Sequence, residues 1–384
     1  MFLMHLRLTE VTMRDLIVFG EDFGGLPSST QHLVRQLAKT HKVLWINSIG
    51  LRQPRLSVKD VTRAFNKLFG KTNAITQNMS DSVGLSNIKV ANLRTIPAPA
   101  SYASRKLAQI MMLRQLKPMI EELNLQDPIL WTSLPTAVDL CGHLGESAVV
   151  YYCGDDFSAL AGVDHQTVAE HESKLIDKAD LIFAASKELV KKFPKCKTQL
   201  LPHGVDVELF STPAARAEDL PSSHRPIAGF YGSLSKWLDY DMIGHVAHAM
   251  PEWDFVFIGP NELDTLMLPK LHNVHYLGPR PHQTLPSYSQ HWDISLLPFV
   301  DNEQIQACSP LKLMEYLAAG TPIVTTPFPA MASYQKHVTA INNAQEMIQA
   351  LSNARQLTHS PISIVEKDSW KNRGNFVHWM LELL

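Results

Sequence analysis

Short runs of apolar residues recur along this chain, and stretches with helical spacing of apolar positions separate them. In the first half the runs fall at residues 16–19, 43–46, 129–131, 149–152 and 181–185, and in the second half at 227–231, 255–258, 274–277, 294–297 and 323–325. Continuous apolar strands that alternate with helices are typical of a parallel sheet covered on both faces. The pattern therefore predicts an α/β protein with two Rossmann-like domains.

The segment between the two series predicts an interdomain linker. Residues 211–225 contain Pro213 and Pro221 and show little apolar periodicity. We therefore expect an N-terminal domain over residues 13–210 and a C-terminal domain over residues 226–365. Residues 366–384 have helical spacing and no strand after them, so we expect a helix that packs across the interface.

Composition and charge narrow the class of protein. A formal net charge of -2 gives no overall field that favours nucleic acid, and we expect no such partner. The four cysteines lie far apart, which argues against a zinc cluster or a disulfide framework and fits the cytoplasm. No apolar run approaches the roughly 18 residues that cross a bilayer, and the first residues lack an export signal. We expect a cytoplasmic protein.

The loop after the first strand is one candidate for ligand contact. Gly24 and Gly25 let the backbone approach a ligand, and the helix that follows offers free N–H groups to an anion. The alternative is a tight turn that only connects the strand to the helix.

A short helix near residues 309–320 is the second candidate. Ser309 suits the N-cap, Pro310 the first helical position and Gly320 the C-terminal end. Lys312 and Glu315 share one face, so Lys312 and the helix N-terminus can neutralise a diphosphate while Glu315 accepts hydrogen bonds from ribose hydroxyls. The alternative is an exposed ion pair.

This helix resembles the nucleotide-binding helix of the retaining glycosyltransferase family 4, whose members share the GT-B fold with two domains facing a cleft. The resemblance implies that Glu315 holds the donor ribose, whereas the family's first glutamate falls on Ala307. Residues 24–25, 201–206, 229–234 and 257–260 resemble the family in the same order. With residues 151–158, the set looks closest to bacterial enzymes of surface-polysaccharide assembly, such as teichuronic acid glycosyltransferases.

The resemblance also implies basic side chains that contact the donor phosphates. Ser233 occupies the position of the family's arginine, so Lys236 and Arg280 are our candidates for the missing charge. The alternative is that these long side chains only solvate the surface. The expected donor site comprises Gly24, Gly25, Gly232, Lys236, Arg280, Ser309, Pro310, Leu311, Lys312 and Glu315.

Two carboxylates follow the predicted strand at residues 149–152. Asp155 and Asp156 stand at its carboxyl end, where ligands of open parallel sheets bind. We expect one of them to be catalytic, by orienting or deprotonating the acceptor hydroxyl. The alternative is that Asp156 caps the next helix.

Two basic groups lie beside apolar positions in the N-terminal half, in a pattern typical of helices that lie on membranes. They predict peripheral contact with the inner face of the membrane, and the alternative is a solvated helix face. The groups are Lys59, Arg63, Lys67 and Lys71, then Arg105, Lys106, Arg114 and Lys117.

These features predict a glycosyltransferase that moves a sugar from UDP or GDP to a glycan or lipid-linked acceptor in bacterial polysaccharide biosynthesis. Retention of configuration follows from the resemblance alone. We expect no cofactor and no metal, because N–H groups and cations can stabilise the leaving diphosphate. The alternatives are a non-catalytic nucleotide-sugar-binding assembly partner, a sugar-nucleotide epimerase and, last, a nicotinamide-dependent oxidoreductase.

Overall fold

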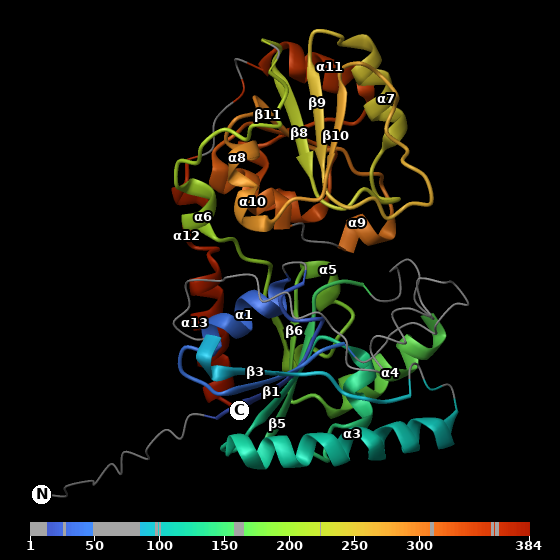
Figure 1. Cartoon of the computed structure of the whole chain (residues 1–384), viewed down its shortest axis with the longest axis vertical. Helices are drawn as coiled ribbons and strands as arrows, with labels where there is room; N and C mark the ends of the chain where they lie inside the picture. Colours follow the sequence, from blue (N-terminus) through green and yellow to red (C-terminus); the bar gives the residue numbers. More distant parts are fainter. Residues whose placement is uncertain are drawn as a thin grey trace, which may run out of the picture.

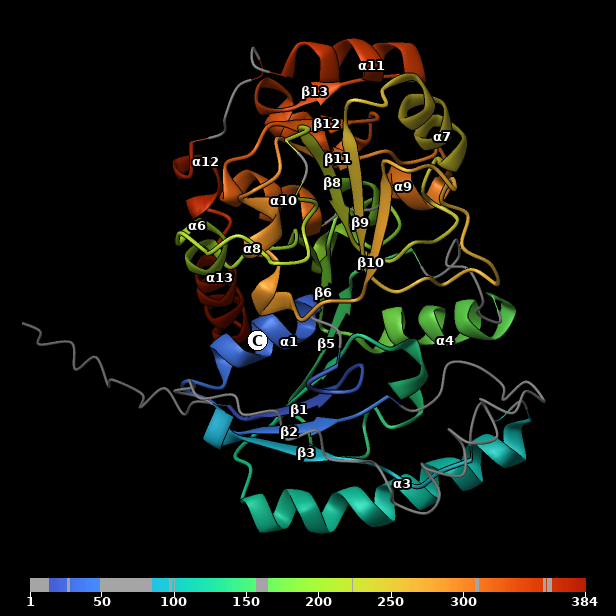
Figure 2. The ribbon, with the colours of Figure 1, turned by 45° about the horizontal axis from the view of Figure 1, so that its top comes forward.

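The chain forms two α/β domains, one above the other in Figure 1, and each is built on a parallel sheet. The computed structural model describes residues 14–25, 28–48, 85–96, 99, 101–156, 165–222, 224–307, 311–354, 357 and 361–384. Figure 2 shows the same two sheets from another side, with helices packed around them. The prediction of an α/β fold with two parallel sheets is confirmed.

The N-terminal sheet has seven strands in the order β3-β2-β1-β4-β5-β6-β7, and all of its pairs are parallel. Its strands β1, β2, β4, β5 and β6 are buried along their whole length. The strands are β1 (Leu16–Phe19), β2 (Val43–Ile46), β3 (Ile88–Ala91), β4 (Ile129–Thr132), β5 (Ala148–Cys153), β6 (Leu181–Ala184) and β7 (Thr198–Leu200).

The C-terminal sheet has six strands in the order β10-β9-β8-β11-β12-β13, again all parallel. A second hydrophobic core surrounds it, separate from the core of the first sheet. The strands are β8 (Ile227–Tyr231), β9 (Asp254–Ile258), β10 (Val274–Gly278), β11 (Ile294–Leu297), β12 (Ile323–Thr325) and β13 (Thr339–Ala340).

The apolar pattern did not predict three strands, and all three lie at sheet edges. β3 exposes Lys89 and Val90, β7 exposes Gln199 and Leu200, and β13 has two residues. An edge strand has a partner on one side only and is largely solvated here, so no apolar run marks it.

The helices cover the faces of the sheets and connect consecutive strands. Within the described residues, no helix is long and apolar enough to cross a membrane. The helices are α1 (Ser29–Leu37), α3 (Tyr102–Leu123), α4 (His165–Lys178), α5 (Lys187–Val190), α6 (Val207–Ser211), α7 (Tyr240–Ala249), α8 (Pro286–Ser289), α9 (Glu303–Ala307), α10 (Leu311–Ala319), α11 (Ala344–Ser352), α12 (Ser363–Glu366) and α13 (Trp370–Glu382).

The last helix, α13, returns from the C-terminal domain and packs on α1 of the N-terminal domain (Figure 1), as predicted. Trp370, Val377 and Leu381 are buried in the core of the N-terminal domain. Gly374 faces α1 so closely that an added Cβ would lie 2.5 Å from the Cβ of Gln36. The helix therefore ties the end of the chain to the first domain.

The chain crosses between the domains twice, and the two crossings pair with each other. Val205 donates its N–H to the Asp368 carbonyl at 3.1 Å, and Trp370 donates to the Val205 carbonyl at 3.1 Å. Gly204 lies directly against the Trp370 ring, where a Cβ would be 2.8 Å from a ring carbon. This pairing joins the two domains and holds them in a fixed relative position at one side of their interface.

Gly374→Ala tests the close approach of α13 to α1. Alanine in a helix normally gains about 1 kcal/mol over glycine. Here the added methyl group meets Gln36, so we expect a net loss of about 1–3 kcal/mol in the free energy of unfolding. Thermal unfolding measures it.

Gly244→Ala is the matched control, because Gly244 lies within α7 and an added Cβ there meets no atom within 4 Å. This variant is expected to gain stability. If both variants gain equally, the helices are not in the contact described.

Candidate functional site

A cavity of about 410 Å³ opens between the two domains. Its walls come from segments that follow β1, β4 and β5 in one domain and β8 and β11 in the other, together with the first turn of α10. Open parallel sheets bind ligands at the carboxyl ends of their strands. The cavity therefore lies where both sheets are suited to hold a ligand.

The N-terminal wall contains a buried histidine held by two hydroxyl groups. His203 Nδ1 lies 2.5 Å from Ser29 Oγ and 3.2 Å from the Tyr152 hydroxyl. Burial, together with the charges of Lys312 and Arg373, lowers the pKa of His203 to about 4. This part of the wall is polar but uncharged at neutral pH.

The C-terminal wall contains Lys312, in the first turn of α10. Gly232, directly after β8, lies against it, and an added Cβ there would be 3.0 Å from Lys312 Cε. The positive φ of Gly232, 148°, also favours glycine. Gly232 thus leaves room for the lysine, while Trp237 and Phe299 give the rest of this wall an apolar surface.

Asp155 lines the cavity on the N-terminal side, and Lys312 acts on its charge from the other domain. Asp155 is exposed, and the cavity that it lines has walls from both domains. Burial raises its pKa, Lys312 opposes that rise and Asp156 adds to it. An acid and a base from different domains therefore interact across the cavity.

Asp156, the second predicted carboxylate, is in a different place. It forms an ion pair with Lys192, near the end of α5, and is not among the described residues that line the cavity. The structure brings Asp155, but not Asp156, together with Lys312 and Gly232.

Glu315 lies one turn beyond Lys312 on α10 and is buried. Its Oε1 accepts a hydrogen bond from His282 Nε2 at 2.8 Å. Burial raises its pKa, but the hydrogen bond and charge of His282 and the charge of Lys312 outweigh burial and lower it. Glu315 is held as a carboxylate beside the cavity and is not among its described lining residues.

The two loop glycines shape the wall without lining the cavity. Gly24, with a positive φ of 79°, donates its N–H to Gln31 Oε1 at 3.0 Å. Gly25 donates to the Asp22 carbonyl at 3.1 Å. Both hold the loop whose first residue, Glu21, does line the cavity.

The other two predicted basic residues are not part of the described cavity lining. Lys236 is exposed and is not among the described lining residues. Arg280 forms an ion pair with Asp219 at 2.5 Å and a hydrogen bond with the Tyr288 hydroxyl at 3.0 Å, which fastens the linker to the C-terminal domain. Leu311 lines the cavity, whereas Ser309 and Pro310 lie outside the described residues.

Sequence reasoning gave no ligand role to Glu21, Ser29, His203 or His282. Glu21 carried the same signal as Asp155, a carboxylate directly after a buried strand. Ser29 and His203 are 174 residues apart, and His282 and Glu315 are 33 apart, so spacing could not reveal these pairs. Within the described part of the chain, no group of three or more His, Cys, Asp or Glu could hold a metal ion.

Comparison with solved structures identifies the fold. HepE of Anabaena, in complex with UDP and glucose, has a TM-score of 0.67 at 13% identity over 97% of this chain and 100% of that chain. Sucrose-phosphate synthase of Thermosynechococcus elongatus has a TM-score of 0.68 at 12% identity over 96% and 98%. The two facing Rossmann-like domains therefore have the GT-B fold, as the resemblance implied.

A curated relative is similar over part of the chain. The putative teichuronic acid biosynthesis glycosyltransferase TuaH of Bacillus subtilis (strain 168) is 30% identical over 247 residues, which are 58% of this chain and 62% of the relative. Residues 225–356 match the family described as glycosyl transferases group 1. The matched residues contain the C-terminal sheet and Gly232, Lys312 and Glu315.

Proposed function

We propose that this protein is a glycosyltransferase that moves a sugar from UDP or GDP to a glycan or lipid-linked acceptor in bacterial polysaccharide biosynthesis, with retention. The observation that carries the proposal is the cavity between the domains, with Lys312 in the first turn of α10. The group 1 domain, the relative named for teichuronic acid biosynthesis and the neighbour named with UDP and glucose support it.

The donor side of the proposed site is the C-terminal wall. Lys312 and the N–H groups of the first turn of α10 stabilise the diphosphate, where negative charge grows as the bond to the sugar breaks. The roles of Ser309 and Pro310 in this site stay predictions from the sequence. Glu315, kept ionised by His282, accepts hydrogen bonds from the ribose. The reaction so described uses no metal.

The acceptor side is the N-terminal wall. Asp155 lies across the cavity from Lys312, so it can orient an acceptor hydroxyl toward the sugar held on the opposite wall. Water is kept away from the reacting atoms by the apolar side chains of Trp237 and Phe299.

One observation favours a second candidate, a nucleotide-sugar-binding partner without activity. Ser233 lines the cavity at the position where the family has an arginine. Among the described residues that line the cavity, Lys312 is the only lysine or arginine. Turnover of the nucleotide sugar distinguishes the two candidates. Omitting the acceptor separates transfer from the epimerase alternative, which needs none.

Lys312→Met tests the donor site. The variant keeps the length of the side chain and removes its charge, so we expect the affinity for UDP or GDP to fall about tenfold. Glu315→Gln is expected to weaken binding by a similar factor, because a ribose hydroxyl then meets an uncharged acceptor. Titration calorimetry with UDP, GDP and their glucose conjugates measures both.

Lys236→Met is the matched control, because Lys236 is exposed and is not among the described residues that line the cavity. It should bind like the wild type. Equal losses in Lys236→Met and Lys312→Met would contradict the site. Binding and turnover are expected to be unchanged in EDTA, and a loss there would contradict a metal-independent reaction.

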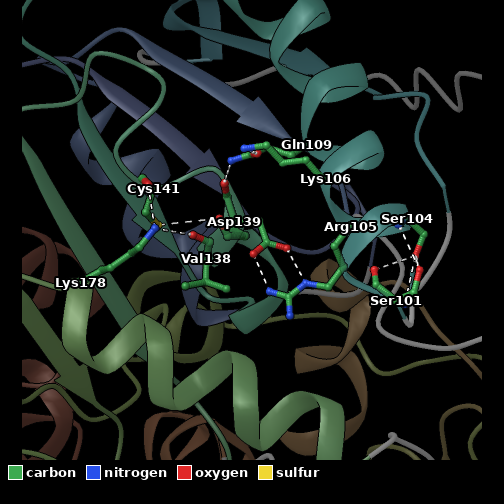
Figure 3. Close-up of polar contacts among 10 residues, drawn as sticks. Ser101, Ser104, Arg105, Lys106, Gln109, Val138, Asp139, Cys141 and Lys178 are labelled. Carbon is green, nitrogen blue, oxygen red and sulfur yellow. Dashed lines mark hydrogen bonds and ion pairs between the residues drawn. The ribbon is translucent and has the colours of Figure 1, made fainter.

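We also assign α3 as a membrane contact of the proposed enzyme. Its inner face is fastened to the domain (Figure 3): Arg105 pairs with Asp139 through two hydrogen bonds of 2.9 and 2.5 Å, and Gln109 donates to the Asp139 carbonyl. Figures 1 and 2 place α3 at the end of the N-terminal domain far from the C-terminal domain.

The outer face of α3 combines apolar and basic side chains. Tyr102 is 85% exposed, Leu107 52% and Ile110 39%, while Arg114 and Lys117 continue the same stripe. Such a face can bury its apolar side chains at the surface of an anionic bilayer. The other basic group predicted for this role, at residues 59–71, lies outside the described residues.

Replacing Lys106, Arg114 and Lys117 with glutamine tests this contact. Each basic residue near an anionic surface contributes about 1 kcal/mol, so the triple variant should lose on the order of 100-fold in affinity for phosphatidylglycerol vesicles. Vesicle sedimentation measures it. A matched triple variant of exposed lysines elsewhere, at Lys195, Lys270 and Lys371, should sediment like the wild type. If both variants lose equally, α3 is not the contact.

A further inference from the structure

His203 is fastened at one end of its ring and has an unused nitrogen at the other. The residue lies between β7 and the first interdomain crossing, and it lines the cavity. Nδ1 lies 2.5 Å from Ser29 Oγ and 3.2 Å from the Tyr152 hydroxyl. Nε2 has no hydrogen-bond partner among the described residues, and it is not one of their fully buried unpaired atoms. A ligand in the cavity can therefore reach Nε2.

The backbone on both sides of His203 is held in place. Leu201 donates its N–H to the Ala184 carbonyl of β6 at 2.9 Å. Gly204 lies against the Trp370 ring, where an added Cβ would be 2.8 Å from a ring carbon. The imidazole is thus positioned before any ligand binds, so binding does not have to order it.

The two hydroxyl groups decide which ring nitrogen carries the proton. Burial raises the pKa of Tyr152 above its usual range, so its hydroxyl keeps a proton to donate, as the Ser29 hydroxyl does. Nδ1 is the acceptor that both hydroxyl groups share. A neutral imidazole carries one proton, so with Nδ1 as an acceptor that proton is on Nε2. His203 therefore offers the cavity an N–H donor.

Other side-chain hydroxyl groups on this wall already have protein partners. Thr30 Oγ1 and Ser133 Oγ lie 2.6 Å apart, and Ser28 Oγ accepts the Gln31 N–H at 3.2 Å. These pairs hold the start of α1 in place. His203 Nε2 differs from them because its hydrogen bond is left for a ligand.

The charges near His203 favour an anionic acceptor for this hydrogen bond. Lys312, on the opposite wall, and Arg373 of α13 both act on the ring, which stays neutral at neutral pH. Lys312 is the only lysine or arginine among the described lining residues, whereas a nucleoside diphosphate carries more than one negative charge. A neutral N–H adds a hydrogen bond to such an anion without the repulsion that a further cation would meet beside Lys312.

We propose that His203 donates its Nε2–H to an oxygen of the donor's diphosphate, opposite Lys312, so that both domains hold the diphosphate. The inference rests on the proposed function and deepens it, because it names a donor-binding residue on the N-terminal wall. His203 keeps its proton throughout. Negative charge on the diphosphate grows as the bond to the sugar breaks, so this hydrogen bond strengthens during transfer.

Two substitutions separate the two ends of the ring. Asparagine places its amide near the position of Nδ1 and does not reach that of Nε2, whereas glutamine extends an N–H donor toward the position of Nε2. His203→Asn should lower the affinity for UDP or GDP about tenfold, and His203→Gln should keep an affinity near that of the wild type. Titration calorimetry on the full chain measures both. Uridine and guanosine lack the diphosphate and should bind equally to all three proteins.

His245→Asn is the control, because His245 is exposed on α7 and is not among the described residues that line the cavity. It should bind UDP and GDP like the wild type. A histidine needed only for its Nδ1 contacts gives the opposite order, with His203→Gln weaker than His203→Asn, and that order overturns the proposal. So does unchanged diphosphate binding in His203→Asn, or an equal loss for the nucleosides.

The protonation of His203 gives a readout that needs no sugar transfer. Heteronuclear NMR of histidine-labelled protein, with His203→Asn to assign the signal, should show the Nε2–H form. The Nε2 resonance should move when the diphosphate is added and stay in place with the nucleoside. An Nδ1–H form, or no binding of either diphosphate to the wild type, sinks the inference. If the diphosphate binds as expected but no sugar is transferred, the proposed function fails and the role of His203 stands.

Discussion

The pairing of the two interdomain crossings is the constraint on which the site depends. Backbone hydrogen bonds from Val205 to Asp368 and from Trp370 to Val205 join segments that are far apart in sequence. Because each crossing leads into a different core, their pairing sets how the two sheets face each other. His203 belongs to the first crossing, so a residue of the cavity wall is positioned by the same contact that positions the domains.

The interface beside this pairing is aromatic. His32 of α1 stacks on Trp370 with ring centroids 4.7 Å apart, and burial lowers the pKa of His32 to about 3. His282 lies 6.0 Å from His32 and donates to Glu315. A neutral ring can be buried at this interface without the cost of a buried charge. Glu315, the carboxylate proposed to hold the ribose, is thus held by His282, which also lies close to His32 of the N-terminal domain.

The sequence allowed the fold to be predicted well and the site only in part. Buried strands appear as apolar runs, so every predicted strand was found, while solvated edge strands such as β3 carried no such signal. Asp155 and Asp156 are neighbours in sequence, yet only Asp155 lines the cavity, because Asp156 pairs with Lys192, which is 36 residues away. Arg280 pairs with Asp219, 61 residues away, which no local pattern indicates.

The charges of the two walls give the proposed reaction an order. Asp155 and Lys312 both line the cavity, and the charge of Lys312 opposes the rise in the pKa of Asp155. A diphosphate that binds Lys312 competes with that interaction, and Asp155 then needs another donor, which an acceptor hydroxyl can provide. Donor binding in the proposed enzyme therefore leaves Asp155 on the N-terminal wall to hydrogen-bond an acceptor hydroxyl. The acceptor is thus expected to bind more tightly after the donor.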